Sequence, residues 1–187
     1  LNVRFVNTGL INKTYIIEHL CDGEKSKFIL QSLGNVFLSH EIVNMNHKVI
    51  TDHINKKINN DYSQSDCKKW KVPSLIRCKS NNLFSFSYGS DFWRAMEYIE
   101  ESFTLDYLED EIMAYQVGIG LARFHLLCSD LDPSKLRNSI NNFHNTSYYI
   151  HQYHKTLNDY KFNKLDSEIR KRIYKLIICL AEHIKIV

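Results

Sequence analysis

The sequence predicts an α+β chain in which a strand-rich first half is followed by a helical second half. Three observations predict this class. Apolar runs at residues 14–20 and 27–31 flank an Asp-Gly pair that is typical of a tight hairpin. Residues 39–58 carry apolar side chains at helical spacing. Beyond Glu101 the apolar residues recur every three or four positions, so the strand pattern gives way to helices.

The first 100 residues are expected to form an antiparallel sheet with one inserted helix. Ser39 supplies an N-cap before an amphipathic helix that runs to about Ile58. An irregular polar loop follows and closes at Pro73, and an Asn81-Asn82 turn suits positive φ. Strands are expected before and after the helix, the last three as a meander, at residues 2–6, 14–20, 27–31, 75–79, 83–88 and 92–99.

The second half is expected to be helical, at residues 108–128, 146–160 and 166–187. The first of these helices has an apolar stripe that must be buried, made of Ile112, Tyr115, Ile119, Ala122 and Leu126. The change of pattern divides the chain into residues 1–100 and residues 101–187.

The composition excludes several classes of protein. Of the 187 residues, 44% are hydrophobic and 24% charged, as in a globular chain. A net charge of +3 and a longest basic cluster of only Lys68, Lys69 and Lys71 argue against a nucleic-acid partner. No apolar stretch approaches the roughly 18 residues of a membrane helix, so no membrane partner is expected. The five cysteines are scattered without a C-x-x-C pair, which is typical of reduced thiols and predicts a cytoplasmic protein; the oligomeric state stays open.

The loop at residues 7–14, between the first two expected strands, is the first candidate for chemistry. It contains a glycine, two asparagines and threonines, whose side chains and backbone N–H groups are suited to phosphate. A plain hairpin loop would use the same residue types. The layout of a sheet with one helix after its third strand, a connector and a helical lobe is also that of a kinase-type fold.

Several segments in this order resemble the aminoglycoside-phosphotransferase-like kinases, and within them the branch of the N-acetylhexosamine kinases. The resemblance spans essentially the whole chain. The segments are Gly9–Tyr15, Phe28–Gln31, Asn35–Phe37, Phe92–Arg94, Tyr98–Glu100, Gly120–His125, Asp130–Asp132 and Phe143–Thr146.

The resemblance implies a protein-kinase-like fold, with residues 1–100 as the nucleotide-binding N-lobe and residues 101–187 as a partial C-lobe. It implies transfer of the γ-phosphoryl group of ATP, with Mg²⁺, to a hydroxyl of a sugar or amino sugar. The backbone of the connector, at Glu97, Tyr98, Ile99 and Glu100, would then bind adenine. The first loop would hold the phosphates through Thr8, Gly9, Asn12 and Thr14.

The sequence also departs from the kinase pattern. Gln31 stands where kinases usually place a phosphate-binding Lys, and its expected contact with Glu41 would be polar only. Glu41 is equally explained as a first-turn carboxylate favoured by the helix dipole. No His is followed two residues later by Asp, so the general base and the magnesium ligands are expected beyond Val187. We therefore expect a fragment that does not catalyse phosphoryl transfer by itself.

Other residues leave alternatives open. His144 and Asn145 lie in the segment that would face the phosphate acceptor, although packing or loop capping explains them as well. Trp93 and Arg94 are candidates for a cation–π or ion-pair element, with packing favoured for Trp93. Two alternatives to an active kinase remain: a nucleotide-binding protein of the same fold without catalysis, and an interaction module whose first loop only closes a hairpin.

Overall fold

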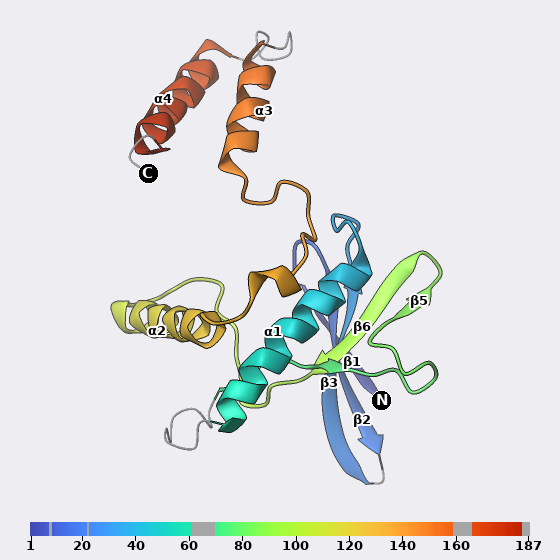
Figure 1. Cartoon of the computed structure of the whole chain (residues 1–187). Helices are drawn as coiled ribbons and strands as arrows, with labels where there is room; N and C mark the ends of the chain where they lie inside the picture. The colour runs from blue at the N-terminus through green and yellow to red at the C-terminus, as the bar shows by residue number, and fades with distance from the viewer. Residues whose placement is uncertain (8, 22, 61–69, 159–165, 185–187) are drawn as a thin grey trace. The chain divides into compact units, whose positions relative to one another are not determined.

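The computed structural model describes residues 1–187 except 8, 22, 61–69, 159–165 and 185–187 (Figure 1). The fold is α+β, with an antiparallel sheet and four α-helices in the described residues. Two compact units make up the chain, Leu1–Asn141 and Asn142–Val187. The helix that follows the sheet, α2 (Glu111–Cys128), belongs to the first unit, which therefore extends beyond residue 100.

The first half of the sheet matches the expectation. Strands β1 (Asn2–Val6), β2 (Lys13–Cys21) and β3 (Glu24–Leu33) are antiparallel neighbours. Gly23 lies between β2 and β3 and has the positive φ, 86°, that the predicted hairpin turn requires, while Asp22 lies outside the described residues. Of the described strands, β3 then pairs with β6 (Asp91–Glu97), which places β6 inside the sheet.

The expected meander is wrong in its connections. Both β4 (Leu75–Ile76) and β5 (Phe86–Tyr88) pair with β6 rather than with each other, and both are shorter than expected. The reason is the segment between them, which closes on itself: the amide of Cys78 donates to the carbonyl of Leu83 at 2.7 Å. Asn82 adopts the predicted positive φ, 58°, in this turn.

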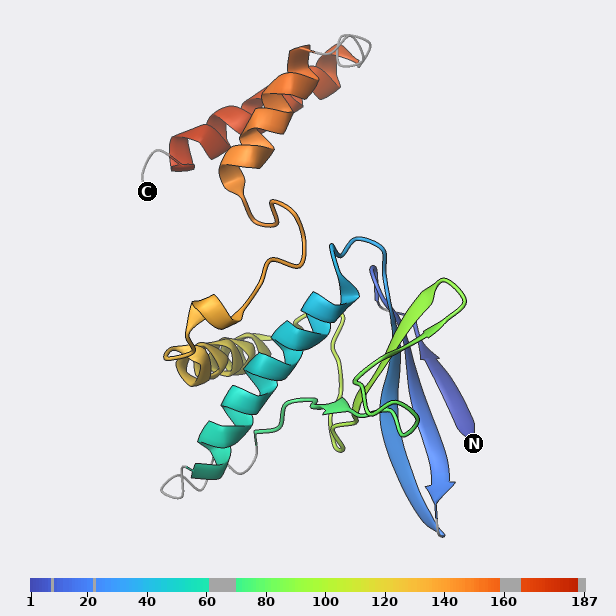
Figure 2. The same cartoon turned by 45° about the vertical axis from the view of Figure 1, so that its right-hand side comes forward.

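Helix α1 (His40–Asn60) lies across one face of the sheet, as Figures 1 and 2 both show. Its buried residues are Asn44, Thr51 and Ile54, and the side chain of Ile54 is fully buried. Ile16 of β2 and Met96 of β6 are also buried, so the core of the first unit lies between this helix and the sheet.

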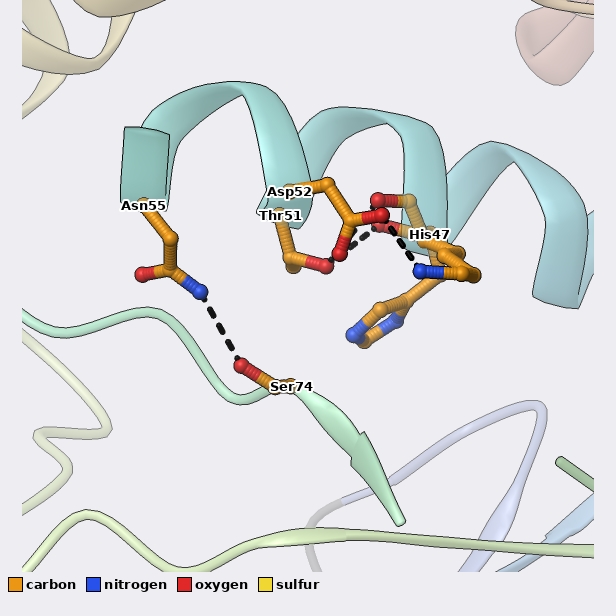
Figure 3. A network of polar contacts seen from close by, with 6 residues as sticks. His47, Thr51, Asp52, Asn55 and Ser74 are labelled. Atoms are coloured by element: carbon orange, nitrogen blue, oxygen red, sulfur yellow. Dashed lines mark hydrogen bonds and ion pairs between the residues drawn. The ribbon is translucent and has the colours of Figure 1, made fainter. Parts of the chain in front are cut away.

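Polar contacts fix the helix to the chain that follows it. Burial lowers the pKa of His47, and its Nε2 donates to the carbonyl of Pro73 at 2.6 Å. The side-chain amide of Asn55 donates to Ser74 Oγ at 3.1 Å (Figure 3). These bonds hold the start of β4 against α1.

The predicted apolar stripe of α2 is not buried in the first unit. Ile112, Tyr115 and Leu126 are 73%, 68% and 70% exposed, and no residue of the helix is buried. The helix forms as expected, with Asp110 as its N-cap. Within the first unit it packs against α1, a single helix that covers only part of its surface.

The second unit contains α3 (Thr146–Asn158) and α4 (Ser167–Ile184), close to the bounds expected from the sequence. The side chain of Asp166 accepts from the amide of Glu168 at 2.8 Å, which caps α4. Among the described residues of both units, no helix has the length and apolar character needed to cross a membrane.

Candidate functional site

A row of polar side chains crosses three neighbouring strands on one face of the sheet. Thr14, Gln31 and Arg94 are direct partners in the register of β2, β3 and β6. Side chains of such partners lie on the same face and within contact distance. Gln31 Nε2 donates to Thr14 Oγ1 at 3.0 Å, and Gln31 Oε1 accepts from Arg94 Nε at 3.0 Å and Nη2 at 2.7 Å.

Helix α1 completes this row from above the sheet. Arg94 Nη1 donates to Asn44 Oδ1 at 3.3 Å. We call Thr14, Gln31, Arg94 and Asn44 the polar row. It places four hydrogen-bonding side chains between the sheet and α1, where the neighbouring positions of the same strands, Ile16 and Met96, are buried and apolar.

The polar row contains a buried positive charge without a negative partner. Arg94 is 8% exposed, and burial lowers its pKa to about 10, which leaves it charged at neutral pH. Among the described residues it forms no ion pair with a carboxylate; its partners are the neutral amide oxygens of Gln31 and Asn44. An unpaired buried charge is costly, so such an arrangement is uncommon without a functional reason.

Asn44 adds an unsatisfied donor at the same place. Its Nδ2 is buried and has no hydrogen-bond partner in the described structure. Exchanging the two ends of the amide would not help, because the nitrogen would then face the N–H groups of Arg94. The polar row therefore offers an N–H group and a positive charge, both of which favour an anion.

The loop between β1 and β2 folds back onto the end of β3. Asn12 Oδ1 accepts from the amide of Gly34 at 3.0 Å. A Cβ at Gly34 would lie 2.4 Å from the carbonyl oxygen of Ile11, and one at Gly9 would lie 2.8 Å from the carbonyl oxygen of Asn12. Glycine is thus required at both positions by close backbone approach. Thr8, also expected in this loop, lies outside the described residues.

The expected contact between Gln31 and Glu41 is not among the described hydrogen bonds. Glu41 is exposed and accepts from the hydroxyl of Ser39 at 2.6 Å, the main reason why its pKa is lowered. Ser39 Oγ also accepts from the amide of Ile42 at 3.3 Å, as the predicted N-cap should. Glu41 thus fits its alternative reading as a first-turn carboxylate, and Arg94 takes the place beside Gln31.

The connector residues lie at a different part of the first unit, beside a cavity of about 860 Å³. Glu97, Tyr98 and Ile99 line it together with Lys27 of β3. Lys27 lies 5.3 Å from the centre of the Tyr98 ring and 3.6 Å from a carboxylate oxygen of Glu100. Lys27 thus contacts two of the four connector residues, Tyr98 and Glu100, and Glu97 and Ile99 line the same cavity.

Part of the connector backbone is already engaged. The amide of Glu97 donates to the carbonyl of Ser74 at 2.9 Å, and the carbonyl of Ile99 accepts from Ser102 Oγ at 2.5 Å. The first bond extends the pairing of β4 with β6 by one residue, and the second closes the turn that follows the connector. Hydrogen bonds from this segment to a base would therefore use the backbone of Tyr98 and Glu100, or the amide of Ile99.

His144 and Asn145 belong to the second unit. Asn145 Oδ1 accepts from the amide of Tyr148 at 3.0 Å, so Asn145 caps α3. The ring of His144 lies 4.0 Å, centre to centre, from that of Phe143, and its φ is 57°. These contacts are the packing and capping roles that the sequence left as alternatives to acceptor binding.

A second charged cluster joins α1 to the chain after α2. Asp130 accepts from Lys57 and lies 3.0 Å from His53 Nε2. The hydrogen bond from Lys57 is the largest cause that lowers the pKa of Asp130 to about 2. In the described ranges no three His, Cys, Asp or Glu residues are grouped as metal ligands would be. We interpret the Asp130 cluster as a structural tie.

The polar row as a unit was not predicted from the sequence. Arg94 was considered only beside Trp93, and Asn44 was not considered. A signal was present: Phe92, Arg94 and Met96 alternate along one strand, so they share a face, and an arginine between two apolar residues on a covered face needs a partner.

No protein-family model matches this sequence, and no curated protein matches it significantly. The residues and their geometry therefore carry the functional argument.

Proposed function

We propose that this chain is the nucleotide-binding part of an ATP-dependent phosphotransferase that acts on a hydroxyl of a sugar or amino sugar. The observation that carries the proposal is the polar row. Arg94, charged and without a carboxylate partner among the described residues, donates to Gln31, and Gln31 donates to Thr14, which follows a glycine-containing loop. The protein-kinase-like arrangement is part of the proposal. A helix after the third strand of an antiparallel sheet, with a connector that follows the last strand, supports it.

The two regions of the first unit have properties that suit the two ends of ATP. The connector cavity, about 860 Å³, is large enough for a nucleoside and is lined by the aromatic ring of Tyr98 and by Ile99 and Val72. The polar row offers a cation and amide groups for phosphate oxygens. Mg²⁺ ligands and the general base are expected outside these residues, so no step of the transfer is assigned to the residues described.

Binding of nucleotide to the 187-residue chain is the first test. We expect ATP to raise the melting temperature and to bind more tightly than adenosine, because the phosphates add contacts with the polar row. GTP serves as the control for the base. If neither ATP nor adenosine binds at millimolar concentration, nucleotide binding is wrong for this chain.

The catalytic half of the proposal needs a different test. The encoding DNA beyond codon 187 should continue into an H-x-D-x-x-x-x-N pattern followed by a second Asp, and that longer protein should consume ATP in the presence of a hexosamine. A continuation without that first Asp would leave a nucleotide-binding protein without catalysis.

One observation favours the alternative of an interaction module. Apolar side chains on α2 are widely exposed within the first unit, among them Val117 (54%), Leu121 (56%) and Leu126 (70%). Exposed apolar surface of this kind is typical of a face that packs against another element or protein. This alternative predicts no stabilisation of the chain by ATP.

A further inference from the structure

We propose that Arg94 is the residue that binds a nucleotide phosphate, in place of the lysine that Gln31 replaces. The inference rests on the proposed nucleotide-binding function and names the charged group that this function otherwise lacks. It concerns the binding of phosphate groups and does not depend on which sugar accepts the phosphoryl group.

The guanidinium of Arg94 has hydrogen-bonding capacity left for such a ligand. An arginine side chain carries five N–H donors. The described structure gives Arg94 three hydrogen bonds, two to Gln31 Oε1 and one to Asn44 Oδ1. The acceptors are neutral oxygens, so an anionic oxygen in the same place would form stronger, charge-assisted bonds.

Gln31 shows where that oxygen would sit. A single atom, Gln31 Oε1, accepts from both Nε and Nη2 of Arg94, at 3.0 and 2.7 Å, which is how one oxygen of a phosphate binds that edge of a guanidinium. Gln31 and Thr14 are only partly buried, whereas Arg94 is buried beneath them. A change of the Gln31 rotamer alone would then expose the guanidinium edge to a ligand.

Asn44 supplies a second, independent reason. Its buried Nδ2 has no acceptor in the described structure, although its Oδ1 is held by Arg94. Leaving a buried donor unsatisfied destabilises a protein, and a ligand oxygen reaching Arg94 would be close to this donor. The cation of Arg94, from the sheet, and the unsatisfied donor of Asn44, from α1, thus lie together.

The position in the fold favours a nucleotide phosphate over another anion. The polar row starts at Thr14, immediately after the loop that contains Gly9 and Asn12. The Ile11–Asn12 end of that loop lies against the chain after β3, where the backbone of Ile11 approaches Gly34 closely and Asn12 accepts a hydrogen bond from the amide of Gly34. A fixed loop next to a buried cation is the arrangement that phosphate groups require.

The test uses a variant that fills the site without removing the arginine. Gln31→Glu places a carboxylate at the atoms that already contact Arg94, so the charge is neutralised inside the chain. We expect the urea midpoint of unfolding to stay the same or rise, because a buried cation gains a partner. We also expect the preference for ATP over adenosine, which should be roughly 10- to 100-fold in the wild type, to disappear. Affinity for adenosine should not change.

Two further variants separate this role from a purely structural one. Arg94→Gln should lose the same preference, and Arg94→Lys should recover part of it. Arg4→Gln is the matched control, because Arg4 is an exposed arginine on the same sheet, and its loss should leave the preference intact. Calorimetric titration with ATP, adenosine and inorganic tripolyphosphate measures all of these outcomes.

The results distinguish the two proposals. If Gln31→Glu and Arg94→Gln keep the wild-type preference for ATP, the role of Arg94 is wrong while nucleotide binding stands. If the wild type binds ATP no better than adenosine, the phosphate site is wrong. If tripolyphosphate binds to the wild type but not to Gln31→Glu or Arg94→Gln, and neither ATP nor adenosine binds, the phosphate site is supported and the proposed nucleotide-binding function is wrong. If no probe binds, both are overturned.

Discussion

Replacing Ile54 by alanine should unfold the first unit at much lower denaturant concentration, because this side chain of α1 is fully buried. Ile54 is 0% exposed. The change removes three carbons, at about 0.8 kcal/mol each from the hydrophobic term, and leaves a cavity. We therefore expect a loss of about 3 kcal/mol in the free energy of unfolding. Ile54→Val removes one carbon and should lose about 1 kcal/mol.

Tryptophan fluorescence during urea unfolding is a suitable assay. Both tryptophans of the chain, Trp70 and Trp93, belong to the first unit, so the signal reports on the unit that contains Ile54. The matched control is Ile112→Ala in α2, where the side chain is 73% exposed; its effect should be below about 0.5 kcal/mol.

Two results would refute the reasoning. If Ile54→Ala and Ile112→Ala lower the stability equally, then α1 does not pack on the sheet through Ile54. If Ile54→Val is as damaging as Ile54→Ala, the effect is not one of lost volume. Either result would also undermine the polar row, because Asn44 reaches Arg94 from the same helix.

Three further changes test other parts of the structure. Gly34→Ala should destabilise the first unit by more than about 1 kcal/mol and weaken ATP binding, because a Cβ there would lie 2.4 Å from a carbonyl oxygen. The control, Gly118→Ala, has open space around it and should stabilise α2 slightly. Urea unfolding of both variants measures the difference in stability. Asp130→Asn should remove a pH-dependent part of the stability. The pKa of Asp130 in the folded protein, about 2, lies below the ordinary aspartate value of 3.8, so its contribution is present above about pH 4 and is lost as the pH falls through about 2. Equal pH profiles of wild type and variant would contradict this. Asn145→Ala should cost α3 about 1 kcal/mol through loss of its cap, seen as faster amide exchange in the first turn; unchanged exchange would refute the capping role.

Local signals in the sequence predicted most of the elements. The Asp-Gly pair and the Asn81-Asn82 pair predicted turns, and both turns contain a residue with positive φ, Gly23 at 86° and Asn82 at 58°. The helices begin within a few residues of their predicted starts, and the predicted N-cap Ser39 accepts from the amide of Ile42. These features depend on neighbours in the chain.

Features that depend on distant residues were predicted less well. The order of β4, β5 and β6 depends on which strand edge each segment meets, and alternation within a strand carries no such information. The stripe on α2 predicted a buried face, whereas its residues are exposed in the described structure. Gln31 was expected to contact Glu41 of α1, but its hydrogen-bond partner is Arg94 of β6, and α1 contributes Asn44 to this cluster.

If Gln31 stands where a kinase would have a lysine, as the resemblance implies, the proposed phosphate site need not lack a charge, because a neighbouring strand can supply it. Gln31 and Arg94 are partners in the register of β3 and β6, and such partners lie about 5 Å apart. The long side chain of Arg94 spans that distance and reaches the amide oxygen of Gln31. The positive charge would then come from β6 instead of β3, and a search for a lysine on the third strand would not find it.

A paired exchange tests this reading. The double variant Gln31→Lys with Arg94→Gln returns the cation to β3 and keeps the total charge and the number of amides in the row. We expect it to prefer ATP over adenosine about as strongly as the wild type, whereas Arg94→Gln alone should not. If the double variant folds with the wild-type urea midpoint and shows no preference, the position of the guanidinium matters more than its charge. The idea of a charge that is interchangeable between strands would then be wrong.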